Sequence, residues 1–355
     1  MSLELKGVSK QVDGETHIYP TDLKLETGSF NMLLGTTGSG KTTLMQIMAG
    51  LEPVSSGQIF FNGADVTGVP VQKRNVSMVY QQFINYPNFT VFENIASPLR
   101  VAKVPEAEIK RRVDEMAELM KLGPMLQRRP SELSGGQQQR TAMARALVKD
   151  SSLVLLDEPL ANLDFKLREE LRDELPKLIA KRNCVVVYAT TEPIEALLFA
   201  GHTATLHQGR VTQFGPTSDI YRTPKDLISA KVFSEPPINT AKVVKEGNVI
   251  KLGSDIKWEA KGNLSNMKDG QYTFGIRPHH VTAQELGEQA IKVEGSVQIT
   301  EISGSESVVH FNMHGNSWVS QSHGVQYHDV GSVAHLFADV SQGLYFDDKD
   351  QLVSL

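Results

Sequence analysis

One octapeptide near the start constrains the fold of this chain more than any other segment. Residues 35–42, GTTGSGKT, match the phosphate-binding pattern G-x-x-x-x-G-K-S/T. An apolar run at 31–34 precedes the loop, and apolar residues at helical spacing over 44–51 follow it. Strand, glycine-rich loop and helix in this order are the context in which such loops hold phosphates. The segment therefore predicts an α/β nucleotide-binding fold.

The residue types in this loop suit phosphate and magnesium binding. The glycines let the backbone curl so that several N–H groups point at one phosphate, and the following helix adds the positive end of its dipole. Lys41 is expected to reach the β- and γ-phosphates of ATP, and the Thr42 hydroxyl to ligate Mg²⁺. The predicted nucleotide-binding residues here are Gly35, Thr36, Thr37, Gly38, Ser39, Gly40, Lys41, Thr42 and Thr43.

A second apolar run ends in two acids. Residues 153–156 are Leu-Val-Leu-Leu, and Asp157 and Glu158 follow them. An acid at a strand end beside a phosphate loop can hold Mg²⁺, which is the role predicted for Asp157. The neighbouring carboxylate can polarise the attacking water, which makes Glu158 the predicted catalytic residue. Taken alone, the segment is equally consistent with ordinary solvated acids at a strand end.

The segment Leu133-Ser134-Gly135-Gly136-Gln137 lies between the phosphate loop and the acidic strand. With those two motifs in this order, the chain resembles the ATPases of ABC transporters, whose signature motif this segment matches. Ser134 and the glycines would form a second phosphate cradle at a helix N-terminus. The resemblance implies that the cradle serves ATP held by a partner subunit, so that two nucleotides lie between two such domains. The predicted contacts are Ser134, Gly135, Gly136 and Gln137.

Two further positions match the family one residue at a time. Gln81 follows the apolar run 77–80 and resembles the glutamine that touches Mg²⁺ and senses the membrane partner. It is therefore predicted as both a metal-contacting and a catalytic residue, although the adjacent Gln82 leaves the register open by one. The segment 160–164 resembles the family's D-loop, with Ala161 where serine is common.

The segment 81–100 resembles the surface that receives the coupling helices of the transmembrane permease subunits. Its side chains could equally belong to a core, and both interpretations stay open at this point. The residues concerned are Phe83, Tyr86, Pro87 and Phe89.

The chain departs from the family pattern after the strand predicted at 184–190. The switch histidine of the family falls on Thr191. A threonine hydroxyl is shorter than an imidazole and cannot become a cation. We therefore expect the chain's own ATPase site to be slow, which favours a heterodimer with a second ATPase subunit, although a homodimer remains open. The alternative function is a regulatory subunit that binds nucleotide at a largely inactive site.

A second departure concerns the adenine base. The family usually stacks adenine on an aromatic residue in the first strand region, which here falls near Gln11 or Val12, and neither is aromatic. Tyr19 is a possible substitute, but no register argument requires it.

The order of elements predicts two domains. Strands alternate with helices over 1–235, which implies a mostly parallel sheet covered on both faces, with a helical subdomain at about 85–150. Past Pro236-Pro237 the pattern turns to short alternating segments and polar turns, so 236–355 is expected to be β-rich. Pro176 should kink its helix or end it early. Helices are expected at about 44–51, 105–121, 134–148, 167–178 and 193–200.

Stretches of the second domain resemble the sugar-importer branch of these ATPases, in which an OB-like (TOBE-type) β-barrel domain serves dimer contact and regulation. They are residues 221–224, 275–278 and 343–347. Within that branch, Thr191-Glu192-Pro193 and the need for a different partner resemble importers of glycerol or polyols. The resemblance thus predicts an ATPase that powers import of a carbohydrate or polyol.

Composition limits the remaining function classes. The 355 residues carry a net charge of -5, which gives no electrostatic reason to expect nucleic-acid binding. Cys184 is the one cysteine and is expected to be buried in a strand. The start of the chain lacks the basic and apolar regions of a signal peptide, and no apolar run is long enough to span a membrane. We expect a peripheral protein on the cytoplasmic face of the inner membrane, held there by its permease.

Overall fold

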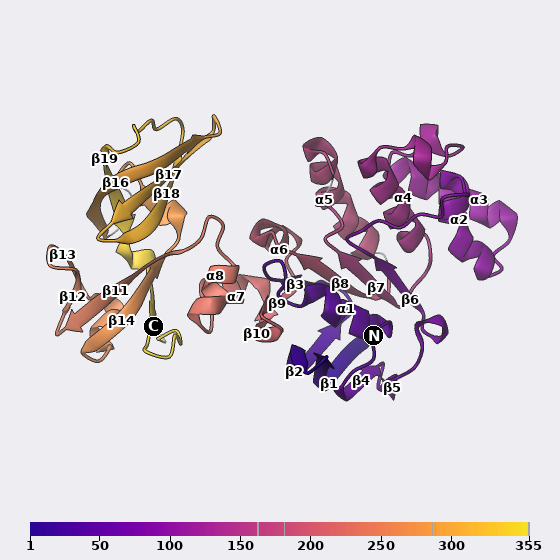
Figure 1. The fold of residues 1–355 in the computed structure, drawn as a ribbon, viewed down its shortest axis with the longest axis horizontal. Coiled ribbons are helices and arrows are strands. Elements are labelled where there is room, and N and C mark those ends of the chain that lie inside the picture. Colours follow the sequence, from indigo (N-terminus) through magenta and orange to yellow (C-terminus); the bar gives the residue numbers. More distant parts are fainter. Residues whose placement is uncertain (162, 181, 286, 288, 354–355) are drawn as a thin grey trace. The chain divides into compact units, whose positions relative to one another are not determined.

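A computed structural model describes residues 1–355 except residues 162, 181, 286, 288 and 354–355. The chain packs as two compact units, Met1–Ile220 and Tyr221–Leu355 (Figure 1). The expected boundary at residue 235 lies later than this division. Helix α7 (Thr217–Arg222) crosses it, and α8 (Leu227–Val232) packs with Ile238, Leu344 and Phe346 of the second unit.

The first unit is organised around a six-stranded sheet in the order β10-β9-β3-β8-β7-β6. Every residue of its central strands is buried, as expected for a parallel sheet covered on both faces. All neighbouring pairs are parallel except β10, which runs antiparallel to β9. The strands are β3 (Phe30–Leu34), β6 (Val76–Val79), β7 (Leu153–Asp157), β8 (Val185–Thr190), β9 (His202–His207) and β10 (Arg210–Pro216).

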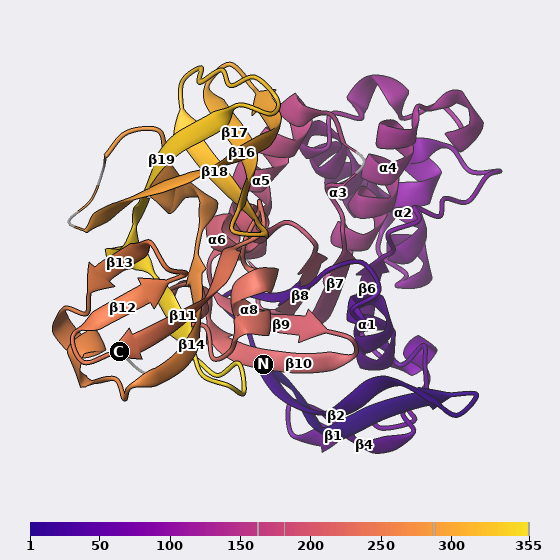
Figure 2. The same ribbon diagram turned by 60° about the vertical axis from the view of Figure 1, so that its left-hand side comes forward.

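A second, antiparallel sheet in this unit has the order β2-β1-β4-β5. Its buried leucines and isoleucines share one core with the larger sheet and with α1 (Lys41–Ala49), which lies between them (Figure 2). The strands are β1 (Ser2–Val12), β2 (Glu15–Glu26), β4 (Ser56–Phe61) and β5 (Ala64–Asp65).

Three helices form a separate group within the expected helical subdomain (Figures 1 and 2). The expected helix at 105–121 is α3 (Glu106–Leu119), and the one at 134–148 is α4 (Gly135–Leu147). Sequence analysis missed α2 (Val91–Val101), because the nearby aromatics and Pro98 obscured its apolar stripe. Thr90 starts this helix with a capping box, accepting from the Glu93 N–H while the Glu93 carboxylate accepts from the Thr90 N–H.

Helix α5 (Phe165–Ala180) continues past Pro176, so of the two effects expected of this proline, a kink or an early end, the early end is wrong. A proline removes one backbone donor, whereas Leu171, Leu175 and Ile179 keep a continuous buried stripe on either side of it. Helix α6 (Pro193–Phe199) follows β8, and Cys184 is buried just before that strand. None of the described helices is long and apolar enough to cross a membrane.

The second unit is β-rich, which confirms the OB-like expectation for this part. Its antiparallel sheets have the orders β13-β12-β11-β14-β20 and β15-β19-β16-β17-β18. One core joins the two sheets, and its largest members are Trp258, Phe274, Phe311, Trp318 and Tyr345. The strands are β11 (Asn239–Glu246), β12 (Val249–Leu252), β13 (Ile256–Glu259), β14 (Gly270–Ile276), β15 (Val281–Thr282), β16 (Ala290–Ile302), β17 (Glu306–Met313), β18 (Asn316–His323), β19 (Val333–Asp339) and β20 (Leu344–Phe346).

Candidate functional site

The phosphate loop joins the end of β3 to the start of α1, as its sequence predicts. Gly40 precedes the helix with a φ of 101°, and a Cβ atom there would lie 2.8 Å from the Ile18 side chain. Both the backbone conformation and the close approach of β2 therefore require glycine at this position. The Gly35 N–H donates to the Thr190 carbonyl at the end of β8, which fixes the start of the loop to the sheet.

Lys41 lies inside the curve of this loop. Its ammonium donates to the carbonyls of Gly35 and Thr36, at 2.8 and 3.2 Å, and forms an ion pair with Glu158 at 3.4 Å. The side chain is 5% exposed. Burial lowers the pKa of Lys41, while the Glu158 carboxylate opposes that shift. The ammonium is thus held where an incoming phosphate would meet it.

The two acids at the end of β7 take different partners. The Thr42 hydroxyl donates to Asp157 Oδ2 at 2.7 Å, whereas Gln81 Nε2 donates to Glu158 Oε2 at 3.0 Å. Burial raises the pKa of Asp157, and the Thr42 hydrogen bond opposes that shift. The chain thus brings together Lys41 and four other predicted residues, Thr42, Gln81, Asp157 and Glu158.

The oxygen atoms at this point fit Mg²⁺. Among the described residues, Asp157 Oδ1 is buried without a hydrogen-bond partner, and so is Ser39 Oγ in the adjacent loop. A buried carboxylate oxygen left unpaired is costly unless another group satisfies it. Together with the Thr42 hydroxyl it offers the hard oxygen ligands that Mg²⁺ prefers.

Glu158 has an unusual backbone conformation. Its φ is 45°, in the left-handed region, where a residue with a side chain costs about 1–3 kcal/mol. The Glu158 N–H donates to the Ala189 carbonyl at 3.0 Å, and the Ala161 N–H donates to the Glu158 carbonyl at 3.3 Å. These two bonds offset the strain and direct the carboxylate toward Lys41 and Gln81.

A cavity of about 510 Å³ opens beside the phosphate loop. Tyr19 of β2 lies at this cavity beside the turn at Gln208–Gly209. The Tyr19 N–H donates to the Gly209 carbonyl at 2.9 Å, and the Arg210 guanidinium lies 3.3 Å from the Tyr19 ring centroid. Gln11 and Val12 are exposed. Tyr19 and His17 are therefore the aromatic side chains at this cavity, and Tyr19 has the larger ring system of the two side chains. The lining is Thr16, His17, Tyr19, Thr37, Gly38, Gly40, Lys41, Thr42, Thr43, Gln81, Glu158, Gln208 and Gly209.

The predicted signature segment lies elsewhere on the first unit. Ser134 caps α4, its hydroxyl accepting from the Gln137 N–H while the Gln137 side chain accepts from the Ser134 N–H. Ser134 and Gly135 are exposed, and Gly136 and Gln137 are half-buried. Ser134–Gln137 are not part of the lining of the cavity beside the phosphate loop. Within one chain, the two predicted phosphate cradles are therefore separate.

Thr191 directly follows β8 and is exposed. It is close in sequence to Ala189, whose carbonyl accepts from the Glu158 N–H, but it does not line the cavity. Thr191 thus occupies the strand end next to the acid pair without a hydrogen bond to Glu158.

The aromatic segment before α2 is mostly exposed: Tyr86, Pro87 and Phe89 are exposed, and Phe83 is half-buried. The exposed fractions of Ile84, Tyr86 and Phe89 are 61%, 49% and 41%. Buried Asn94 holds this loop through the Tyr86 N–H and the carbonyls of Tyr86 and Phe89. Arg145 of α4 stacks its guanidinium on Tyr86. Sequence analysis missed both supports, because neither Asn94 nor Arg145 belongs to a recognisable motif.

Comparisons with known proteins agree on one family. A family model described as ABC transporter matches residues 18–161. The sn-glycerol-3-phosphate import ATP-binding protein UgpC of Pectobacterium atrosepticum is 33% identical over 353 residues, covering 99% of this chain and 98% of that protein. The maltose/maltodextrin import ATP-binding protein MalK of Vibrio cholerae is 35% identical over 321 residues, covering 89% of this chain and 86% of that protein.

Similarity to solved structures covers a smaller part of the chain. A dimeric ATP-binding cassette in a post-hydrolysis state, bound to ADP and Pi, aligns with a TM-score of 0.56 and 28% identity. The alignment covers 61% of this chain and 98% of that one.

Proposed function

The chain belongs to the family of ABC transporter ATP-binding proteins, and from this premise we propose that it binds and hydrolyses ATP to power solute import through a membrane permease. The observation that carries the proposal is the convergence of Lys41, Thr42, Gln81 and Glu158 on one cavity beside Asp157. ATP binding by the purified chain, with Lys41→Ala as the variant, tests it. We expect Lys41→Ala to abolish binding, and unchanged binding would contradict the proposal.

Each residue of the site has one task in this proposal. The N–H groups of the loop Gly35–Thr42 and the Lys41 ammonium bind the β- and γ-phosphates. The Glu158 carboxylate accepts a hydrogen bond from the attacking water. When bound, Mg²⁺ would supply positive charge that offsets the negative charge developing on the phosphate groups. Thr42, Asp157 and Gln81 would hold it, and the hydrogen bond from the Thr42 hydroxyl to Asp157 already places two of these ligands side by side.

Tyr19 is proposed to support the adenine base. Its ring lies at the cavity wall and is covered on one face by Arg210. A base stacked on the ring would gain dispersion and desolvation energy. No other residue of the cavity lining has a phenyl or indole ring.

A second ATP-binding subunit is the first proposed partner. The phosphate loop and the Ser134–Gln137 cradle are separate within one chain, so each requires its counterpart from another subunit. Thr191 in place of a histidine favours a non-identical partner, because a complete site then forms from this chain's cradle and the partner's own acid pair. Copurification from native membranes tests this: a different ATP-binding chain supports the heterodimer, and a second copy alone contradicts it.

The permease is the second proposed partner. The loop that presents Ile84, Tyr86 and Phe89 is an exposed apolar surface on a rigid support, which suits the apolar face of a short amphipathic helix. Binding there would hold the chain at the cytoplasmic face of the membrane as a peripheral subunit.

A carbohydrate or polyol is the proposed solute class. UgpC is named for import of sn-glycerol-3-phosphate and MalK for import of maltose and maltodextrin. Both match this chain across its β-rich second unit as well as its first. We propose that the second unit regulates the ATPase, as the resemblance implies.

Slow ATP hydrolysis at this chain's own site would leave one alternative function. If Thr191 leaves the attacking water poorly held, the chain would act mainly as a nucleotide-binding regulator of a competent partner. Single-turnover hydrolysis with and without the partner subunit separates the two functions. Hydrolysis at this chain's own acid pair favours the ATPase, whereas lasting retention of ATP there favours the regulator.

A further inference from the structure

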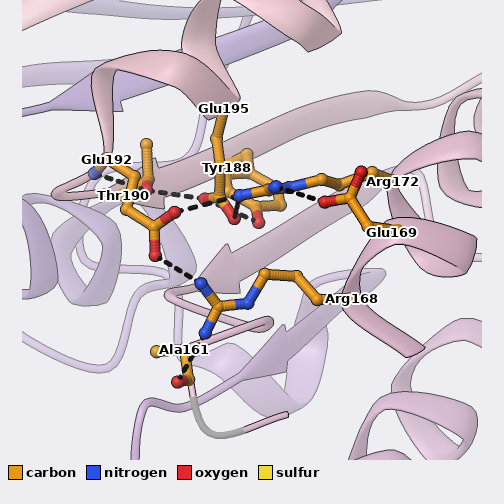
Figure 3. Close-up of polar contacts among 8 residues, drawn as sticks. All are labelled: Ala161, Arg168, Glu169, Arg172, Tyr188, Thr190, Glu192 and Glu195. Carbon is orange, nitrogen blue, oxygen red and sulfur yellow. Dashed lines mark hydrogen bonds and ion pairs between the residues drawn. The ribbon is translucent and has the colours of Figure 1, made fainter. Parts of the chain in front are cut away.

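An ion-pair network connects α5, the end of β8 and the start of α6 (Figure 3). Arg168 of α5 donates from one guanidinium nitrogen to the Glu192 carboxylate at 3.0 Å. It donates from the other nitrogen to the Ala161 carbonyl at 3.2 Å. One guanidinium therefore joins two segments that are far apart in sequence: the turn 158–161, which carries the catalytic acid, and the segment 190–192, which carries Thr191.

Arg168 is connected to Glu158 through one residue, Ala161. The Ala161 carbonyl accepts from Arg168, while the Ala161 N–H donates to the Glu158 carbonyl at 3.3 Å. This turn contains the left-handed backbone of Glu158. A residue held in a sparsely populated conformation persists only where its surroundings fix it. Arg168 supplies one of those restraints through the Ala161 peptide.

The other side of the connection is anchored by buried groups. Arg172 also donates to Glu192, at 2.9 Å, and the Glu192 N–H donates to the Thr190 hydroxyl at 3.0 Å. That hydroxyl donates in turn to Glu195, which is 3% exposed and also accepts from the Tyr188 hydroxyl (Figure 3). Glu192 is thus held through both its backbone and its side chain, so the segment 190–192 is a fixed point for Arg168.

We propose that Arg168, oriented by Glu192, is a positioning residue that sets the Glu158 turn relative to the Thr191 segment. This proposal rests on the function proposed above, in which Glu158 orients the attacking water. The Arg168–Glu192 pair is partly exposed, at 24% and 29%, so its charge attraction alone contributes little. Its importance is geometric: the planar fork of the guanidinium reaches acceptors on two different segments from separate nitrogens, an arrangement that the compact ammonium of a lysine does not reproduce.

Hydrolysis at this chain's own site tests the proposal, measured in the complex with its copurifying partner after the partner's catalytic acid has been replaced by glutamine. We expect Arg168→Gln to lower kcat about 10- to 100-fold without changing ATP affinity, because a small displacement of the acid affects the reaction and not phosphate binding. Arg168→Lys should fail to restore the rate. Lys177→Gln is the matched control, since Lys177 pairs with Glu174 on the same helix and is 64% exposed. A normal kcat in Arg168→Gln, or full rescue by lysine, would overturn the proposal.

Hydrogen exchange gives a second measurement that does not require turnover. Glu192→Gln should speed amide exchange in residues 158–161, which Glu192 does not contact, by weakening the hold on Arg168. Exchange altered only around 190–195 would overturn the proposal. Binding of ATP to these variants separates the two claims: loss of nucleotide binding by Lys41→Ala alone supports the proposed function whatever the exchange result is.

Discussion

Glu158 is held through both its side chain and its backbone. Lys41, Gln81, Ala161 and Ala189 contact its side chain or its backbone. Because these contacts come from four different segments, Glu158 is sensitive to small movements in each of them. The adjacent Asp157, by contrast, is fixed by burial and by one hydroxyl.

Replacement of the residue after β8 tests why the site should be slow. We predict that Thr191→His raises single-turnover hydrolysis by about 10²–10³-fold, because an imidazole can reach the γ-phosphate that a threonine hydroxyl cannot. Thr191→Ser serves as the control and should leave the rate unchanged. The account of a slow site is wrong if the wild-type chain already turns over as fast as Thr191→His.

Replacement of Tyr19 tests the proposed adenine support. Tyr19→Ala should weaken ATP binding about 5- to 150-fold, the loss expected when one base–aromatic stack is removed, whereas Tyr19→Phe should keep the affinity. Titration with ATP and with inorganic triphosphate provides the measurement. Equal weakening for both ligands would mean that Tyr19 acts on the phosphates or on the fold and not on the base.

Sequence patterns predict those site residues that are adjacent to one another in the chain. The residues of Gly35–Thr43 are adjacent in the chain, so their pattern alone indicates their chemistry. The contact of Gln81 with Glu158 depends on β6 and β7 being neighbours in parallel register, which no local pattern states. The stacking of Arg210 on Tyr19 likewise requires β2 to lie beside the turn that precedes β10.

At the scale of elements, the helices follow from capping and apolar spacing. Ser134 with Gln137 predicts the start of α4, whereas Thr90 with Glu93 carried the same signal for α2 and was overlooked among the aromatics. Pro176 shows the limit of such rules, because the buried stripe of α5 outweighs one lost hydrogen bond. Where local signals conflict, as at Pro176, burial of the apolar stripe therefore determines how far the helix extends.

The loop before α2 carries a prediction about assembly. Ile84→Glu should weaken association with the permease about tenfold or more, because it places a charge in an apolar contact. ATP binding should not change, since Ile84 lies outside the nucleotide cavity. Val12→Glu, another exposed apolar position in the first unit, is the control for a general effect of added charge. Copurification of the permease with each variant is the measurement. Equal recovery with Ile84→Glu would contradict the assignment of this surface.

At the scale of the whole molecule, the chain consists of two compact units, and sequence predicts the first in more detail than the second. The first unit contains every residue predicted for ATP binding and hydrolysis, and its motifs were readable from sequence. The second unit could be predicted as β-rich from its alternating pattern, but its two-sheet arrangement around Trp318 and Phe274 depends on pairings distant in sequence. The sequence of the second unit contains no motif that indicates what its proposed regulatory role responds to.

The central claim is that Gly35–Thr42 of one subunit and Ser134–Gln137 of another close on the same ATP. Sedimentation in Mg-ATP, using the Glu158→Gln variant so that ATP persists, tests it most directly. The chain is studied alone and with the ATP-binding subunit that copurifies with it. The account predicts a two-subunit particle that forms with ATP and is lost when Ser134→Arg is added. The account is contradicted if no two-subunit particle forms in both samples, the chain alone and the chain with the second subunit. A particle that persists when Ser134→Arg is added would also contradict it.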